Sequence, residues 1–170
     1  PKSEEGTVDE GANAIVSGTN DEGAKVIKEV FGAKAFNYAK PVSLIRELVR
    51  QSTSESDLVL DFFAGSATTA QAVMEVNSSD AGSRRFIMVS STEATASEPD
   101  KNLCRDVTAE RIRRLNAAGT GRYADLSAEF AYLRTREIDF DALNAELDPA
   151  EAWTALEAMH GLPLTIYDAS

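Results

Sequence analysis

The chain has 170 residues, of which 43% are hydrophobic and 26% are charged, and its formal net charge is −11. This length predicts one domain with a small appendage, and the apolar content is sufficient for a hydrophobic core. The longest apolar runs are too short for a transmembrane helix, and the first residues lack the pattern of a signal peptide. An acidic chain matches DNA phosphates poorly, so DNA contacts are expected from regions outside this chain.

One cysteine, Cys104, is present, so the chain cannot form an intrachain disulfide, which fits the cytoplasm. Cys104 is expected to be a small buried side chain rather than a reactive thiol. The chain opens on Pro1 rather than Met, which predicts a processed chain or an excised piece of a longer one. A local basic cluster is expected to form a solvated helix face; its members are Arg111, Arg113, Arg114 and Arg122.

Helical patterns dominate the first third of the chain. Residues 1–19 are rich in Gly, Ser, Glu and Asp, which predicts a loose lead-in. A short helix is predicted over about residues 21–30, because Thr19 or Asn20 can cap it and Gly32 follows its end. After a connector, a second helix is predicted from Pro41, since apolar residues then recur at helical spacing: Val42, Ile45, Leu48 and Val49.

Two strand patterns alternate with helical ones in the middle of the chain. Residues 58–63 form an apolar run with one acid, which indicates a buried parallel strand. A small-residue turn and a helix ending near Asn77 follow, and then a second strand over residues 85–89. These strands are expected to be parallel neighbours, because a right-handed crossover through the helix joins them. A further helix is predicted over about residues 101–117.

This order of elements predicts an α/β fold with a partial doubly wound sheet. The predicted division is a lead-in over residues 1–19, an α/β domain over residues 20–120 and a C-terminal appendage over residues 121–170. In the appendage, residues 130–133 are compatible with a strand. Asp148 can cap a helix that begins at Pro149, and the Trp153 of that helix is expected in the core. His160, the only histidine, is expected at the surface near the end of that helix.

The segment Asp61–Thr69 carries the pattern with most chemical content. A strand ends in an acid, and a turn of small residues leads into a helix. Such a turn allows backbone N–H groups to approach a ligand, and ligands of open α/β sheets bind at the carboxyl ends of strands. A Walker motif requires a Lys after the turn, and none is present here. A dinucleotide-binding fingerprint requires three spaced glycines, and this turn has only Gly65. The pattern alone leaves a binding site and an ordinary strand-to-helix turn equally open.

Residues 61–69 resemble the Asp-Pro-Phe-x-Gly-Ser-Gly-Thr-Thr motif by which amino-methylating DNA methyltransferases bind S-adenosylmethionine. Residues 37–45 resemble the Lys-Pro helix motif that precedes it in the permuted, β-type members, and residues 84–93 and 102–114 resemble the strand and helix that follow. The chain is most similar to the modification subunits of type III restriction-modification systems. This resemblance implies a Rossmann-like fold that binds S-adenosylmethionine and takes part in methylating the exocyclic amine of adenine in DNA.

The resemblance also assigns cofactor contacts by position. The acid and aromatic residue that end the strand border the methionine end of the cofactor, and the turn that follows gives backbone contacts. The Lys-Pro segment approaches the amino-acid part of the cofactor. In many members an acid after the second strand binds the ribose hydroxyls. Directly after that strand this chain has Ser90, and the acid assigned to this role is Glu93, three residues further on. The residues assigned to the cofactor are Lys40, Ser43, Asp61, Phe63, Gly65, Ser66, Thr68 and Glu93.

The sequence departs from the family pattern at several positions. Phe62 replaces the usual Pro and Ala67 replaces the second Gly. Ala67 is expected to need no positive φ in the first turn of the helix, although its methyl group can narrow the pocket and weaken cofactor binding. The catalytic Asp/Asn-Pro-Pro-Tyr/Phe motif is absent, because no two prolines are adjacent. No catalytic residue is therefore assigned, and the isolated chain is expected to be inactive on DNA.

Three functions stay open from the sequence. The first is the cofactor-binding part of a DNA adenine methyltransferase, with a second copy and a restriction subunit as the partners that the resemblance implies. The second is a non-catalytic interaction module that has kept the fold, and the third is a small-molecule methyltransferase. An Asp-Pro-Pro-Tyr motif and a basic region upstream of Pro1 would support the first, and a start codon just before Pro1 the second. The Lys-Pro helix ahead of Asp61 opposes the third.

Overall fold

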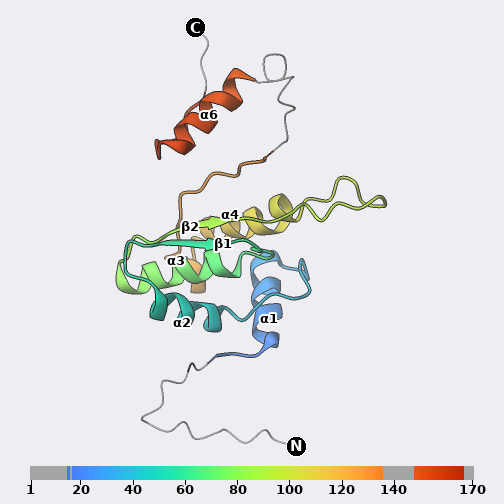
Figure 1. The fold of residues 1–170 in the computed structure, drawn as a ribbon. Coiled ribbons are helices and arrows are strands. Elements are labelled where there is room, and N and C mark those ends of the chain that lie inside the picture. The colour runs from blue at the N-terminus through green and yellow to red at the C-terminus, as the bar shows by residue number, and fades with distance from the viewer. Residues whose placement is uncertain (1–14, 16, 136–147, 167–170) are drawn as a thin grey trace, which may run out of the picture. The chain divides into compact units, whose positions relative to one another are not determined.

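The computed structural model describes residue 15, residues 17–135 and residues 148–166. The chain divides into two compact units, Pro1–Ala128 and Glu129–Ser170. In the first unit the described elements are α1 (Asn20–Phe31), α2 (Val42–Ser52), β1 (Leu58–Asp61), α3 (Thr68–Asp80), β2 (Arg85–Met88), the π-helical η1 (Cys104–Ala109), α4 (Glu110–Asn116) and the short 3-10 helix η2 (Gly121–Tyr123) (Figure 1). In the second unit the described element is α6 (Pro149–Met159).

The strands β1 and β2 pair in parallel. The register runs from Leu58 opposite Arg85 to Asp61 opposite Met88. The helix α3 connects the two strands, as a parallel pair requires. The predicted pair of adjacent parallel strands is therefore confirmed, and the first unit has an α/β fold with a small parallel sheet.

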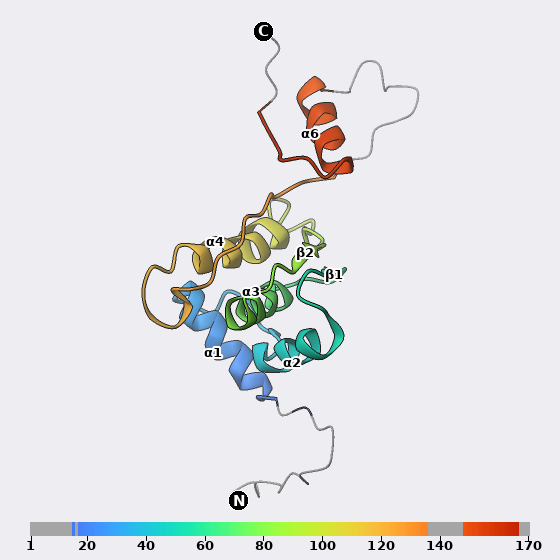
Figure 2. The ribbon, with the colours of Figure 1, turned by 90° about the vertical axis from the view of Figure 1, so that its left-hand side faces the viewer.

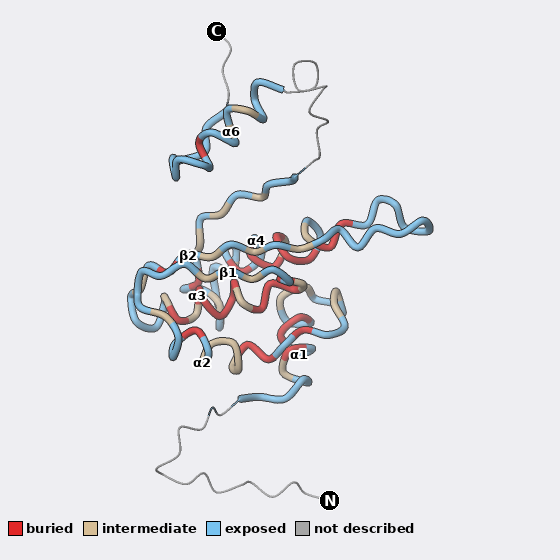
Figure 3. The backbone as a smooth tube through the Cα atoms, viewed as in Figure 1, coloured by how far each residue is buried: buried red, intermediate tan, exposed pale blue. Residues whose placement is uncertain are grey.

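The core of the first unit is built around α3, which lies against the strands while α2 packs against it (Figure 2). Figure 3 shows that buried residues are concentrated in this helix. One cluster joins α2, α3 and the inner face of both strands through Val49, Val73, Val76, Val59 and Phe86. A second cluster joins α1 and α2 to α3 through Val26, Val42 and Ala72.

The two faces of the sheet differ in burial because side chains alternate along each strand. Val59 and Phe86 face the core, whereas Leu58, Leu60 and Ile87 are 51%, 47% and 47% exposed. The prediction of a fully buried strand is therefore wrong for β1. In the part of the chain that the structure describes, helices cover one face of the sheet and leave the other face apolar and accessible.

The predicted helix boundaries agree with the structure where capping residues define them. Thr19 is the N-cap of α1, and Gly32 ends this helix with φ +73°, a conformation that favours glycine. The second helix starts at Val42, directly after Pro41. The third is longer than predicted, since it continues to Asp80.

The helix predicted over residues 101–117 begins later, and its first part is the π-helix η1. Cys104 lies in η1 and is half-buried rather than fully buried. Burial raises the pKa of its thiol above the ordinary value. Among the described residues, no helix is long and apolar enough to cross a membrane.

In the second unit, Asp148 caps α6 as predicted, because its side chain accepts a hydrogen bond from Ala150 N at 2.7 Å. His160 follows the helix and is exposed, as predicted. Trp153 is 43% exposed, so its expected place in a core is wrong among the described residues. Residues 130–133, whose sequence is compatible with a strand, have no regular secondary structure.

Candidate functional site

The turn between β1 and α3 lies at the carboxyl ends of both strands. Ala64 N donates to Val89 O at 3.0 Å, and Val89 N donates to Asp61 O at 2.8 Å. These two bonds tie the start of the turn to the end of the second strand. The turn therefore occupies the edge of the sheet where ligands of open α/β folds bind.

The turn contains two residues with positive φ, Gly65 at +49° and Ala67 at +59°. The expectation that Ala67 needs no positive φ is therefore wrong. A left-handed conformation is unfavourable for Ala, because its Cβ approaches the neighbouring carbonyl, and the cost is about 1–2 kcal/mol. Contacts around the turn must offset this cost, because a residue keeps an unfavourable φ only where its surroundings fix the backbone conformation.

The N-terminus of α3 has no side-chain cap, because Ala67 is the N-cap residue. The N–H groups of Gly65, Ser66, Thr68 and Thr69 have no hydrogen-bond acceptor among the described residues. Unpaired N–H groups at a helix N-terminus favour an anionic ligand group, such as a carboxylate. The turn therefore offers donors that the described fold does not itself use.

Asp61, at the end of β1, is half-buried and anchors the turn. Its Oδ1 accepts from Phe63 N at 2.9 Å, and its Oδ2 accepts from Thr69 Oγ1 at 2.6 Å. A carboxylate has about four acceptor sites, so two stay available for another donor. Phe63 itself is 93% exposed.

Ser66 and Thr68 are buried, and their hydroxyls face the interior. Both are within hydrogen-bond distance of Arg111 Nη1, at 3.4 Å for Ser66 Oγ and 3.3 Å for Thr68 Oγ1. The expectation of a solvated helix face is wrong for Arg111, which is fully buried, and it is confirmed for Arg113, which is exposed. The other two members of the predicted cluster, Arg114 and Arg122, are also exposed.

A pocket lies beside the turn, between residues 35–38, Glu93 and residues 101–107. Phe36 lines this pocket and also lies against Gly65, since a Cβ added to Gly65 would be 3.4 Å from Phe36 Cζ. Glu93 has φ +52° and forms an ion pair with Lys101 at 3.6 Å. The structure therefore brings together Gly65, Glu93 and an aromatic residue that the sequence had not singled out.

The remaining predicted residues are placed differently. Lys40 is exposed and does not line the described pocket. Ser43 donates its hydroxyl to Glu22 Oε2 at 2.5 Å and accepts from Gly18 N at 2.7 Å, so its hydroxyl is engaged within the fold. Neither residue contacts the turn through a hydrogen bond in the described part of the chain.

Sequence reasoning missed the aromatic residues Phe36 and Tyr38, together with Asn102 and Asp106, which line the same pocket. The two aromatic residues lie in the connector just before the Lys-Pro segment. Aromatic residues in a polar connector were the available signal, because a connector has little core in which to bury them.

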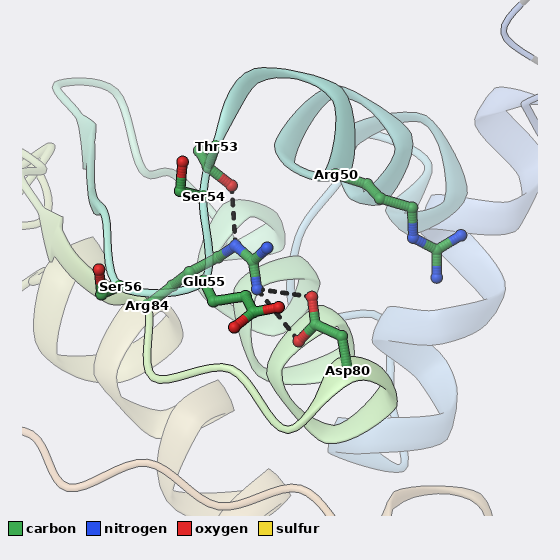
Figure 4. A pocket seen from close by; sticks show the side chains of 7 residues that line it. All are labelled: Arg50, Thr53, Ser54, Glu55, Ser56, Asp80 and Arg84. Atoms are coloured by element: carbon green, nitrogen blue, oxygen red, sulfur yellow. Dashed lines mark hydrogen bonds and ion pairs between the residues drawn. The ribbon is translucent and has the colours of Figure 1, made fainter.

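A second pocket lies at the opposite end of the strands, around Arg84 and the segment Thr53–Ser56 (Figure 4). Arg84 donates to Thr53 Oγ1 at 2.8 Å and pairs with Asp80 at 2.9 Å. Burial raises the pKa of Asp80, but the hydrogen bond and positive charge of Arg84 together with backbone hydrogen bonds outweigh burial and lower this pKa below its ordinary value. These side chains bond to one another and join the ends of α2 and α3, so we interpret their role as stabilising the fold.

Comparison with known proteins identifies the family. A family model described as DNA methylase matches residues 10–96, which is half of the chain. The chain belongs to the DNA methylase family. The family model covers the connector with Phe36, both strands, the turn and Glu93, whereas the pocket residues from Lys101 to Val107 follow the matched region.

Individual relatives of this DNA methylase chain agree with the family. It is 38% identical over 104 residues to the type III restriction-modification enzyme StyLTI Mod subunit of Salmonella typhimurium, which covers 58% of the chain and 16% of that relative. It is 51% identical over 67 residues to the EcoPI Mod subunit of Escherichia phage P1, and this alignment covers 39% of the chain and 10% of that relative. It is 42% identical over 65 residues to the type II methyltransferase M.KpnI of Klebsiella pneumoniae, and this alignment covers 38% of the chain and 16% of that relative. The chain thus spans about a sixth or less of the length of these relatives.

Proposed function

We propose that this chain is the S-adenosylmethionine-binding part of a DNA methyltransferase that methylates the exocyclic amine of adenine within a restriction-modification system. The observation that supports this best is the turn at the carboxyl edge of the sheet, where the N–H groups of Gly65 and Ser66 have no acceptor among the described residues. The turn also adjoins the pocket lined by Phe36 and Glu93. Membership in the DNA methylase family and similarity to Mod subunits support this assignment.

The residues present fit the chemical groups of S-adenosylmethionine. The free carboxylate acceptor sites of Asp61 suit the ammonium of the methionine part, and the N–H groups of Gly65 and Ser66 suit its carboxylate. Glu93 suits the ribose hydroxyls, because a carboxylate accepts hydrogen bonds from both. Phe36 and Tyr38 offer aromatic surface to the adenine ring. The cofactor, when bound, supplies an activated methyl group.

The structure gives less support to the other predicted contacts. The hydroxyls of Ser43, Ser66 and Thr68 are engaged in internal hydrogen bonds, so any role for them is through the backbone or through positioning. Lys40 keeps an exposed ammonium that a flexible side chain can direct toward a carboxylate. We keep these four residues as part of the proposed site in those roles.

We further propose that β1 and β2 belong to a doubly wound, Rossmann-like sheet. In this proposal residues 20–120 form the cofactor-binding domain and residues 121–170 an appendage. The apolar outer face of β1 supports a larger sheet, because both faces of such sheets are covered. The proposed partners are DNA, contacted through regions outside this chain, a second copy of the protein and a restriction subunit, and the proposed location is the cytoplasm.

Cofactor binding can be tested by titrating the ¹⁵N-labelled 170-residue chain with S-adenosylmethionine and recording amide spectra. We expect shifts at Gly65, Ser66 and Thr69 and around Glu93, and none around Arg84, where the second pocket lies. NAD serves as the control ligand, because the turn lacks the glycine pattern that binds its pyrophosphate. If the amides of the turn do not move at saturating S-adenosylmethionine, the proposed site is wrong.

Methyl transfer is a separate step that this chain alone is not expected to perform. Its sequence has no adjacent prolines and so lacks the Asp-Pro-Pro-Tyr motif that would contact the flipped base. Its net charge of −11 also opposes DNA binding. A labelled methyl group should therefore not pass from S-adenosylmethionine to unmethylated DNA in the presence of this chain alone, and turnover would contradict the proposed division of roles.

A further inference from the structure

Two buried side chains that follow β2 contact the carbonyl groups of the turn from inside the molecule. Thr108 of η1 donates from Oγ1 to Gly65 O at 2.7 Å, and Arg111 of α4 donates from Nη1 to Ser66 O at 2.8 Å. Thr108 is 2% exposed and Arg111 is fully buried. The two are three residues apart along continuous helical backbone, so they face the same side.

These contacts orient two successive peptide planes of the turn. In a trans peptide, the C=O and the N–H of the same unit point in opposite directions. Because Gly65 O is directed toward Thr108, the N–H of Ser66 points away from η1, and it has no acceptor among the described residues. Because Ser66 O is directed toward Arg111, the N–H of Ala67 points the other way, where it donates to Ala64 O at 2.7 Å.

Arg111 also contacts the residues on both sides of the strained Ala67. Its Nη1 reaches Ser66 Oγ and Thr68 Oγ1, which flank the φ of +59° at Ala67. A non-glycine residue keeps positive φ only where its surroundings over-determine the backbone. Three acceptors on one guanidinium nitrogen, one of them a backbone carbonyl, provide that constraint.

The guanidinium is itself fixed by a chain of polar contacts that reaches α2. Arg111 Nε donates to Gln71 Oε1 at 2.9 Å, and Gln71 Nε2 donates to Glu75 Oε1 at 2.8 Å. Glu75 Oε2 accepts from Arg46 Nη1 at 3.2 Å. Burying a guanidinium is costly, and its Nη2 has no partner among the described residues, so these contacts and those to the turn must offset the cost.

We propose that Arg111 and Thr108 are positioning residues that set the peptide planes of the Gly65–Ala67 turn. Thr108 directs the free N–H of Ser66 outward toward the cofactor, and Arg111 holds the next peptide in the conformation that closes the turn through Ala67. This inference rests on the proposed cofactor site for its function, but the positioning itself can be measured without any ligand. The two residues touch no reacting group and act through the backbone of the turn.

The test compares amide order parameters and ¹³C shifts of the turn in variants of the ¹⁵N,¹³C-labelled 170-residue chain. In the wild type, Gly65, Ser66 and Ala67 should be rigid, with order parameters of about 0.85. In Arg111→Met and Thr108→Val they should fall below about 0.6, while the strands stay unchanged. Arg111→Lys should restore part of the order, because an ammonium still donates to Ser66 O, and Thr108→Ser should restore it through its hydroxyl.

Arg113→Met is the matched control, because Arg113 lies on the same helix, is exposed and forms an ion pair with Glu110 of that helix at 3.6 Å. It should leave the turn unchanged. A folded Arg111→Met chain whose turn keeps wild-type order and shifts would overturn the proposal. If Arg111→Met does not fold, Thr108→Val against Thr108→Ser decides in the same way.

Calorimetry with S-adenosylmethionine gives the functional readout. Arg111→Met and Thr108→Val should raise the dissociation constant at least about tenfold, which corresponds to about 1.4 kcal/mol, and Thr108→Ser should largely restore it. If the wild type does not bind S-adenosylmethionine but the variants disorder the turn, the proposed function fails and the positioning role stands. If the wild type binds and the disordered variants bind equally well, the positioning role for the cofactor is refuted and the proposed function stands.

Discussion

Thr69 donates its hydroxyl hydrogen to Asp61 Oδ2 across 2.6 Å, which joins the first turn of α3 back to the end of β1. The other oxygen of the same carboxylate accepts from Phe63 N. Asp61 therefore supports the shape of the turn before any ligand is present. Its proposed role as a cofactor ligand is added to this structural role, and a substitution by Ala would remove both at once.

Two conservative substitutions separate these roles. Asp61→Asn keeps an oxygen acceptor but removes the charge, so it should weaken S-adenosylmethionine binding by on the order of 1.5–3 kcal/mol, the value of a charge-assisted hydrogen bond. Thr69→Val keeps the charge and removes one hydrogen bond, so it should lower the free energy of unfolding by about 1 kcal/mol and affect binding less. Calorimetry and urea unfolding measure the two effects. Equal binding by wild type and Asp61→Asn would remove Asp61 from the site.

Gly65 and Gly32 offer a matched pair for a second prediction. Both have positive φ, +49° and +73°, but only Gly65 has a neighbour, Phe36, within reach of an added Cβ. Alanine at either position should lower the free energy of unfolding by a similar amount, about 1–2 kcal/mol, because the left-handed conformation is unfavourable for it. Only Gly65→Ala should also weaken S-adenosylmethionine binding, measured by calorimetry, since it alone strains the backbone of the turn and adds a methyl group beside Phe36. A binding defect of the same size in Gly32→Ala would show that the effect is not local.

The elements that local chemistry determines were predictable from the sequence. The N-cap position of Thr19, capping by Asp148, the glycine after α1 and the apolar runs of both strands depend on neighbours within a few residues. The turn that we propose as the cofactor site was also identified, because its small residues follow an acid at the end of a strand. These features do not require knowledge of how distant segments meet.

Arg111 and Ala67 show where sequence reasoning failed. An arginine in a basic helix is usually solvated, but Arg111 is buried because it donates hydrogen bonds to the carbonyl of Ser66 and the side chain of Gln71. These acceptors lie forty or more residues earlier in the sequence. The positive φ of Ala67 depends on those same contacts, since a glycine would adopt it without help. Both facts arise from tertiary packing between α3 and α4, which no local pattern reports.

The unequal faces of the sheet give a third prediction, because Val59 and Leu60 are adjacent in β1 but point to opposite sides. Val59 packs against Val73 and Val76, whereas Leu60 is 47% exposed. Val59→Asp should lower the free energy of unfolding by more than about 3 kcal/mol, because it buries a charge without a partner. Leu60→Asp introduces the same residue with the same poor strand propensity, but at an exposed position, so it should lower the free energy of unfolding by only about 1 kcal/mol. Urea unfolding of both variants measures the difference, and equal losses would mean that both faces are covered.

The ion pair of Asp80 and Arg84 makes stability depend on pH in the acid range. Asp80 has its pKa lowered in the folded chain, because the effect of burial is outweighed by the hydrogen bond and charge of Arg84 together with backbone hydrogen bonds. A carboxyl with a lowered folded pKa contributes stability above its unfolded pKa, near 3.8, and loses that contribution as pH falls through its folded value. Arg84, whose side chain is 4% exposed, then loses its charged partner.

Asp80→Asn should therefore lower the thermal midpoint of the chain at neutral pH, and the difference from wild type should stay constant down to about pH 5. Below the ordinary pKa of 3.8 the two midpoints should converge, because the wild-type carboxyl also becomes neutral. Asp57→Asn is the control, since Asp57 accepts a hydrogen bond from Ser54 N and has no arginine partner among the described residues. Thermal unfolding followed by circular dichroism from pH 2 to pH 7 measures both variants. A difference for Asp80→Asn that persists unchanged at the lowest pH would show that the variant acts through packing and not through the charge of the pair.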